Sequence, residues 1–183
     1  MIAAVLTSSP VELLASLTVT ETVPAAPART PTTDDFKGGF RHHAAGVALV
    51  VADTPAGPVG LTVSSLASVS ADPPMLSFSV ASIRGSARAL LRAPALDVVL
   101  LSAAHAEVAA AFATPGAPRF TAEQGWLRLP LRLADARATF HGRIAETVAA
   151  GDSRLVLVEV TGVDLGEPAE PLVYVDRAYR TLA

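Results

Sequence analysis

The sequence predicts a mainly β protein, an antiparallel β-barrel in a single domain with a few short helices. Short runs of β-branched and aliphatic residues, bounded by Pro, Gly, Asp or Ser, recur along the chain, and only two helical patterns interrupt them. Strands and helices do not alternate regularly, as a doubly wound parallel sheet would require. A Gly-rich dinucleotide fingerprint is also missing. The Gly57 to Gly60 segment does not provide one, because it is typical of a hairpin turn and not of a strand-to-helix junction.

The chain divides into an N-terminal extension and one domain. Residues 1–35 carry three prolines after position 20 without apolar periodicity, so this extension is expected to be flexible or partly helical. The domain is expected over residues 36–183. A short leading helix is predicted from Phe36, after the candidate N-cap residues Thr33, Asp34 and Asp35.

The domain's strands and helices are predicted from hydrophobic periodicity and turn residues. Helices are expected at 87–91, after an N-cap from Ser82 or Ser86, and at 103–113. Gly151-Asp152 is expected to form the turn between the two longest strands, and Asp72-Pro73-Pro74 to end an earlier one. The expected strands are 47–52, 60–70, 75–80, 96–101, 126–133, 138–148, 155–163 and 172–175.

Composition excludes several classes of function. The net charge is -3, and 13 arginines and one lysine are scattered, so no nucleic-acid partner is expected. No apolar run reaches the roughly 18 residues of a spanning helix, and the N-terminus lacks a basic n-region, so we expect a cytoplasmic protein without a membrane partner. Without cysteine the chain has no disulfides or thiolate ligands. The hydrophobic share of 51% suggests a partner subunit.

The most informative stretch is Gly60 to Pro74. If it forms one strand, Thr62, Ser64, Ser68 and Ser70 share a face with Leu66, and the stretch carries no charge before Asp72. From the pattern alone, exposure of that face to water is the simpler explanation of the hydroxyls. A soluble face usually carries Lys, Glu or Arg, however, and a hydroxyl-lined strand suits a planar polar heterocycle.

A second candidate feature lies between Ser79 and Arg88. Ser82, Ser86 and the first-turn N–H groups of the following helix would hold a phosphate, with Arg84 or Arg88 adding charge-assisted hydrogen bonds. Simple capping of the helix by serine is the alternative explanation.

Together these segments resemble flavin reductase-like domains. The resemblance runs from about Phe36 to Leu182, and the block from Gly60 to Pro74 is its most specific part. The other matching segments are Phe40-Arg41, Ala45 to Val50, Phe112-Ala113, Arg119-Phe120, Gly151-Asp152, Pro171 to Tyr174, and Tyr179.

The resemblance implies a split barrel, usually a homodimer, that binds FMN or FAD and lets NADH or NADPH reduce it for a separate monooxygenase. It places Thr62, Ser64 and Ser65 against the isoalloxazine, with Ser68 contributing its backbone, and Ser79, Ser82 and Ser86 near the ribityl chain and phosphate. The complete implied flavin-binding set is Thr62, Val63, Ser64, Ser65, Ser68, Ser79, Ser82, Arg84 and Ser86.

The sequence departs from the family at two places on the nicotinamide side. Ser153 follows Gly151-Asp152 where the family commonly has His, and Val175 to Ala178 replaces a segment with basic and Gly residues. These departures motivate an alternative hypothesis, a flavin-binding protein without reductase activity. A third hypothesis is a ligand-free barrel that serves as an interaction module.

The histidines provide one weak catalytic candidate. His141 would compensate for the missing histidine if it lay over the flavin. No metal site is expected, because the adjacent His42 and His43 cannot both face one site from a regular element and no carboxylate-rich motif accompanies them. Hydrolase chemistry is not expected either, since no nucleophile-elbow pattern is present.

Overall fold

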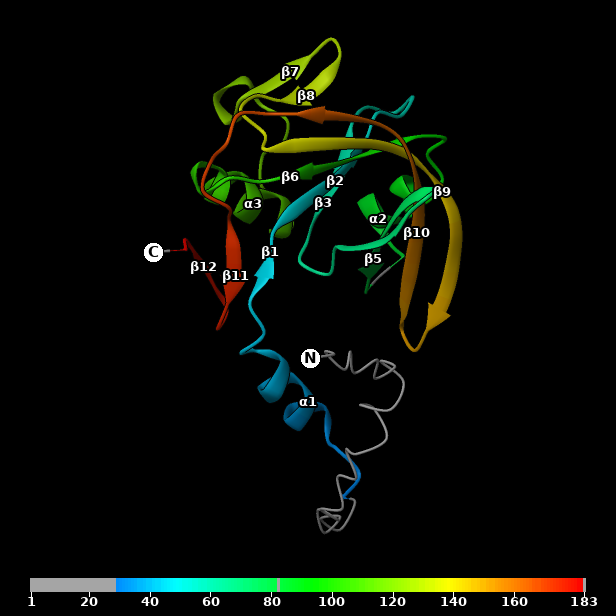
Figure 1. The fold of residues 1–183 in the computed structure, drawn as a ribbon, viewed down its shortest axis with the longest axis vertical. Coiled ribbons are helices and arrows are strands. Elements are labelled where there is room, and N and C mark those ends of the chain that lie inside the picture. Colours follow the sequence, from blue (N-terminus) through cyan, green and yellow to red (C-terminus); the bar gives the residue numbers. More distant parts are fainter. Residues whose placement is uncertain (1–28, 82, 183) are drawn as a thin grey trace, which may run out of the picture.

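A computed structural model of the chain describes residues 29–81 and 83–182 (Figure 1). Its centre is an antiparallel sheet of seven strands, which confirms the predicted mainly β class. In spatial order the strands are β3 (Val59–Val63), β2 (Ala48–Ala52), β6 (Leu96–Leu100), β9 (Ala138–Ala150), β10 (Ser153–Leu165), β5 (Pro74–Val80) and β4 (Ala67–Ala71).

The sheet curls into a barrel because its two longest strands bend. In Figure 1, β9 and β10 lie side by side, across the molecule below the β7–β8 hairpin and along its right-hand side. The register between them shifts at Leu157/Val158 and again at Val160/Gly162. Bulges of this kind bend a strand and increase its twist, so they place the bend where the barrel needs a corner.

The barrel is split between β3 and β5. The strands β3 and β4 form the two ends of the sheet, and residues Ser64 to Leu66 connect them. Across the split, β3 contacts β5 without a backbone ladder. The Ser65 side chain bridges the split in place of a ladder, because its Oγ accepts a hydrogen bond from Ser79 N of β5 at 2.9 Å.

The strand predicted over 60–70 is therefore two strands, and that prediction is wrong. β3 ends at Val63, and β4 begins at Ala67 on the opposite end of the sheet. Ser68 and Ser70 consequently do not share a strand face with Thr62. The strand end predicted at Asp72-Pro73-Pro74 is confirmed, since β4 ends at Ala71 and is followed by β5 in a hairpin.

Two hydrophobic clusters fill the two sides of the sheet. The barrel interior includes the fully buried Phe78, Val98 and Val156. The outer cluster packs β2 and β6 against α3 (Ala106–Ala113) and includes Leu49 and Phe112. Because alternate residues of β2 enter different clusters, all five of its residues are buried, which explains the unbroken apolar run in the sequence.

Shorter elements surround the barrel. A three-stranded sheet joins β1 (Ala45–Gly46), β11 (Val173–Val175) and β12 (Ala178–Arg180), and a hairpin pairs β7 (Trp126–Arg128) with β8 (Leu131–Leu133). The remaining elements are α1 (Thr33–Phe40), α2 (Gly85–Leu90) and the 3₁₀ turns η2 (Ala103–His105) and η3 (Ala122–Gln124). None of the helices in the described part of the chain has the length and apolar character needed to cross a membrane.

The helix starts differ from the predicted ones by a residue or more. Thr32 is the N-cap of α1, in a reciprocal capping box with Asp35, where Thr33 to Asp35 were expected to cap. The N-cap of α2 is Arg84, whose side chain makes no capping hydrogen bond. Ser86 lies inside the helix, so capping does not explain Ser86; Ser82 lies outside the described residues.

Candidate active site

A cleft of about 1250 Å³ opens beside the split in the barrel. One wall is β3 with Ser64 and Ser65, a second is the beginning of α2 with the end of β5, and a third is the loop that follows α3. Arg128 of the β7–β8 hairpin also lines it. The volume slightly exceeds the usual 300–1,000 Å³ range of ligand pockets, so the cleft can hold a large ligand.

Two hydroxyl groups from the predicted site hold the cleft walls together. Thr62 Oγ1 donates a hydrogen bond to the carbonyl oxygen of Ala109 at 2.7 Å, which fixes β3 to α3. Ser65 Oγ bonds the backbone of Ser79 across the split. Between them, Ser64 is exposed and lines the cleft. The cleft shape thus depends on the residues that the resemblance assigns to the ring of the flavin.

Arg119 connects all three walls. Its guanidinium donates hydrogen bonds to Gly60 O of β3 at 3.2 Å, to Ser86 Oγ of α2 at 3.4 Å and to Thr114 O after α3 at 3.1 Å. The guanidinium carbon also lies 5.5 Å from the centre of the Phe112 ring, within the range of a cation–π contact. Arg119 is therefore a half-buried, fixed positive charge in the cleft wall.

The backbone conformation of Phe120 explains why the side chain of Arg119 lies in the cleft. Its φ of 58° lies in the left-handed region, which β-branched or bulky side chains rarely adopt. The Phe120 ring packs with Phe112 and Trp126, at centroid distances of 4.8 Å to each. This buried aromatic cluster holds the unusual backbone in place and leaves the preceding Arg119 side chain in the cleft.

The charge of the cleft suits an anion. Arg84, Arg119 and Arg128 line it, and no aspartate or glutamate is found among its lining residues in the described chain. Because carboxylates are absent from this lining, the three guanidinium groups are not neutralised inside the cleft, and they favour phosphate oxygens.

The cleft brings together most of the predicted flavin-binding residues. Ser68 lies apart, on β4, where it pairs with Leu76 of β5. Ser82 lies outside the described residues. Arg88, the alternative to Arg84, is exposed on α2 and does not line the cleft. The predicted residues that line the cleft are Thr62, Val63, Ser64, Ser65, Ser79, Arg84 and Ser86.

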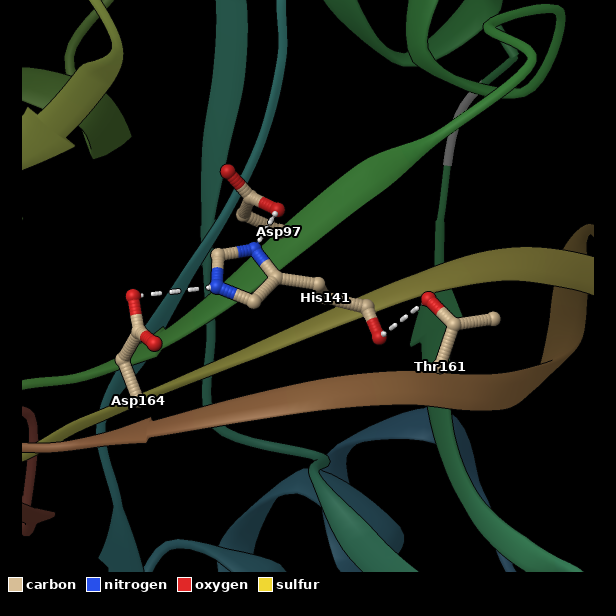
Figure 2. A network of polar contacts seen from close by, with 4 residues as sticks. All are labelled: Asp97, His141, Thr161 and Asp164. Carbon is tan, nitrogen blue, oxygen red and sulfur yellow. Dashed lines mark hydrogen bonds and ion pairs between the residues drawn. The ribbon is translucent and has the colours of Figure 1, made fainter.

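His141 is held elsewhere, between two carboxylates (Figure 2). Its Nδ1 lies 2.7 Å from Asp97 Oδ1 of β6, and its Nε2 lies 3.2 Å from Asp164 Oδ2 of β10. The hydrogen bond with Asp97, more than that with Asp164, raises the pKa of His141 above its ordinary value, although partial burial opposes the shift. The imidazole is not among the cleft-lining side chains, so the structure gives no support to a catalytic role.

The chain belongs to the flavin reductase-like domain family, whose model matches residues 40–183. A relative from Rhodococcus qingshengii, named NADH:FMN oxidoreductase, is 33% identical over 156 residues, which cover 79% of each chain.

Solved structures agree with this family. A flavin reductase domain protein from an Arthrobacter species has a TM-score of 0.74 and 32% identity, covering 81% of this chain and 94% of that one. The flavin reductase of styrene monooxygenase from Pseudomonas putida has a TM-score of 0.71 and 26% identity, covering 81% and 97%.

The donor set of the cleft fits a flavin mononucleotide. The β3 end offers backbone groups and small hydroxyl residues, which suit the polar edge of a flat ring, while Arg84, Ser86 and Arg119 suit a phosphate. Gly85 and Gly116 also line the cleft, and a Cβ built on either meets no atom within 4 Å, so the cleft is open there.

The sequence reasoning missed Arg119 and Arg128 as site residues. Arg119 was part of a segment that matches the family, but nothing local distinguishes it from the other arginines. Its role follows from hydrogen bonds to residues 59 and 33 positions away in the chain. Across the part of the chain that the structure describes, no group of three or more His, Asp or Glu residues is arranged to hold a metal ion.

Proposed function

We propose that the chain is an NAD(P)H:flavin oxidoreductase that reduces FMN or FAD and supplies the reduced flavin to a partner monooxygenase. The observation that carries this proposal is the cleft at the split of the barrel, with a hydroxyl-rich β3 end and a carboxylate-free arginine cluster. Membership of the flavin reductase-like family supports it, and so do the names of the relatives, one an NADH:FMN oxidoreductase and one the reductase of a styrene monooxygenase.

The proposed flavin site consists of Thr62, Val63, Ser64, Ser65, Ser79, Arg84 and Ser86, to which we add Arg119. Thr62 and Ser65 position the β3 segment, because their hydroxyls fix it to α3 and β5. Arg84, Ser86 and Arg119 would hold the phosphate.

A flavin held by these residues would supply the redox chemistry, because flavins accept hydride from reduced nicotinamides. This chain contributes binding and orientation. The rigid β3 segment fixes where a flat ring lies, and the arginines fix the phosphate end. A side chain that transfers a proton is not required by this division of labour.

A steady-state assay tests the proposal. Purified protein is mixed with NADH or NADPH and with FMN, FAD or no flavin, and the absorbance of the reduced nicotinamide is followed. We expect decay that depends on both protein and flavin. Flavin binding without such decay would favour the flavin-binding protein without reductase activity, and protein that binds no flavin at all would favour an interaction module.

The variant Arg84→Gln with Arg119→Gln provides the matched test of the site, with Arg92→Gln and Arg132→Gln as its control. Both double variants remove two positive charges, but only the first pair lines the cleft. We expect the first to raise the KM for FMN by about tenfold or more and the second to leave it within about twofold. An equal effect of both would show that general charge, and not this cleft, attracts the flavin.

We also propose a homodimer in the cytoplasm. Val148 of β9 and Leu155 of β10 are paired across the hairpin, yet they are 41% and 38% exposed. Adjacent exposed aliphatic side chains of this kind are typical of a subunit contact. A cytoplasmic location agrees with the proposed use of NADH or NADPH. Light scattering after gel filtration should give twice the mass of the chain.

A further inference from the structure

The β7–β8 hairpin reaches the cleft but is not part of the barrel sheet. In the part of the chain that the structure describes, its two strands pair only with each other. Figure 1 shows the hairpin at the top of the molecule, and its Arg128 lines the cleft. A two-stranded ribbon on its own is marginally stable, so contacts with the rest of the chain must fix where this arginine lies.

The aromatic cluster fixes the first strand of the hairpin. Trp126 is buried, and its ring packs on Phe120 and Phe112 at centroid distances of 4.8 Å and 5.6 Å. Arg128 lies two residues further on, on the same face of β7 as Trp126. Because Arg119 immediately precedes Phe120 in the chain, this one cluster carries two of the arginines that line the cleft.

His105 fixes the base of the hairpin after its second strand. This buried residue ends the η2 turn directly before α3, and it does not line the cleft. Its Nε2 lies 3.2 Å from the carbonyl oxygen of Ala134, the residue that follows β8. Ala134 N in turn donates a hydrogen bond to Gly125 O at 2.9 Å, which closes the base of the hairpin. His105 therefore ties that base to the beginning of α3.

The hydrogen bonds on the other side of the imidazole determine which ring nitrogen donates. Ser102 N donates a hydrogen bond to His105 Nδ1 at 3.2 Å, and Ser102 Oγ lies 2.9 Å from the same nitrogen. Nδ1 is thus an acceptor. Because a carbonyl oxygen only accepts, Nε2 carries the hydrogen of the bond to Ala134 O. This tautomer holds the ring between Ser102 and Ala134.

The direction of Arg128 matters because of what surrounds it. Arg128 is one of three arginines in a cleft lining that contains no carboxylate among the described residues. A guanidinium that is already directed at its ligand loses less side-chain entropy on binding a phosphate. Arg119 is held by three hydrogen bonds of its own, whereas the place of the exposed Arg128 is set by the strand that carries it.

We propose that His105 is a positioning residue for flavin binding, which fixes the base of the β7–β8 hairpin and so directs Arg128 at the phosphate of the flavin. The inference rests on the proposed function and adds Arg128 to the phosphate-binding residues Arg84, Ser86 and Arg119. It gives a role to a buried imidazole that lies outside the cleft.

Two substitutions of His105 separate the two sides of its ring. Asn keeps an acceptor near the position of Nδ1 but is too short to reach Ala134 O, whereas the longer amide of Gln can donate to Ala134 O. Fluorescence titration measures flavin binding. We expect His105→Asn to raise the Kd for FMN by about threefold to tenfold and His105→Gln to leave it within about twofold of the parent. Riboflavin, which has no phosphate, should bind all three proteins with Kd values within about twofold of one another.

A double-mutant cycle with Arg128→Gln identifies the arginine as the group that His105 acts through. Arg128→Gln should itself raise the Kd for FMN by about threefold to tenfold, and adding His105→Asn should then change that Kd by less than about twofold. Independent effects of the two substitutions, an unchanged Kd for FMN in His105→Asn, or an equal loss of riboflavin binding would each overturn the inference.

Amide hydrogen exchange of the flavin-free proteins tests the anchor without a ligand. His105→Asn should speed exchange over residues 126–134 and leave β2 and β6 as protected as in the parent, whereas His105→Gln should keep the parent's protection. Equal exchange in the parent and His105→Asn, or a loss of protection throughout the barrel, would also reject this role. Because binding and exchange need no turnover, a parent that binds FMN but does not oxidise NADH would reject the proposed function alone.

Discussion

Substituting Gly60 by alanine should destabilise the protein through one crowded methyl group. A Cβ on Gly60 would lie 2.8 Å from Phe112 Cε1 and 2.9 Å from Val51 Cγ1. Carbon atoms pack best at about 3.5–4.0 Å, so both neighbours would have to retreat by roughly 0.6 Å or more. Neither can do so freely, because Val51 is 1% exposed and Phe112 is 3% exposed.

We therefore expect Gly60→Ala to lower the free energy of unfolding by about 1–3 kcal/mol, the usual cost of overpacking a core. Urea unfolding followed by Trp126 fluorescence measures this change, since Trp126 is buried beside the Phe112 ring, with ring centroids 5.6 Å apart. Gly46→Ala is the matched control, because a Cβ there meets no atom within 4 Å. Its unfolding free energy should change by less than about 0.5 kcal/mol.

A double-mutant cycle identifies the cause of the Gly60→Ala penalty. In a Phe112→Leu background the ring edge is absent, so the alanine should cost less than it does in the parent. The same crowding should weaken FMN binding, because Phe112 lines the cleft and supports Arg119. An equal penalty in both backgrounds, or a Gly60→Ala protein as stable as the Gly46→Ala control, would refute this reasoning.

Three further predictions concern the cleft, the core and the histidine network. Arg119→Gln should weaken binding of FMN by about 10-fold to 100-fold and binding of riboflavin, which has no phosphate, by much less; flavin fluorescence titrations compare the two, and equal losses would argue against phosphate contact. Phe78→Ala should lower the unfolding free energy by about 3–5 kcal/mol in urea, since Phe78 is fully buried in the barrel interior. The raised pKa of His141 means that its stabilising contribution is complete below the ordinary value near 6.5 and is lost as pH rises through the folded-state pKa. Urea unfolding at pH 6 and at pH 9 should therefore show a smaller loss of stability in His141→Gln than in the parent, and parallel losses would remove His141 from the explanation.

Local patterns in the sequence were sufficient to predict many of the strands and turns of the barrel. The β2–β3 hairpin, the Gly151-Asp152 turn and the β5 strand all lie where apolar runs and turn residues predicted them. These features are fixed by residues close together in the chain. The resemblance added the family, and the matching segment from Gly60 to Ser65 does line the cleft.

The break after Val63 could not be predicted from the same patterns. Ser64, Ser65 and Leu66 are all compatible with a continuing strand, so period-two alternation runs through them without a signal. The chain leaves β3 there because the barrel closes across the split, where Ser65 bonds Ser79. Only the packed barrel determines that Ser68 belongs to the opposite end of the sheet.

The charged residues of the cleft were equally hidden from the sequence patterns. Arg119 and Arg128 come from two separate segments, the loop after α3 and the β7–β8 hairpin, and no sequence spacing connects them. These arginines matter because the lining of the cleft, in the part of the chain that the structure describes, contains no acidic residue. A cluster of positive charges of this kind forms only in the tertiary structure, whereas helix caps and turns are determined by residues close together in the sequence.

A crystal structure of the protein soaked with FMN tests the central claim most directly. The account predicts electron density for the flavin ring along Thr62 to Ser65 and for the phosphate beside Arg84, Ser86 and Arg119. Density for FMN at any other place, or a cleft that stays free of flavin at saturating FMN, would contradict it.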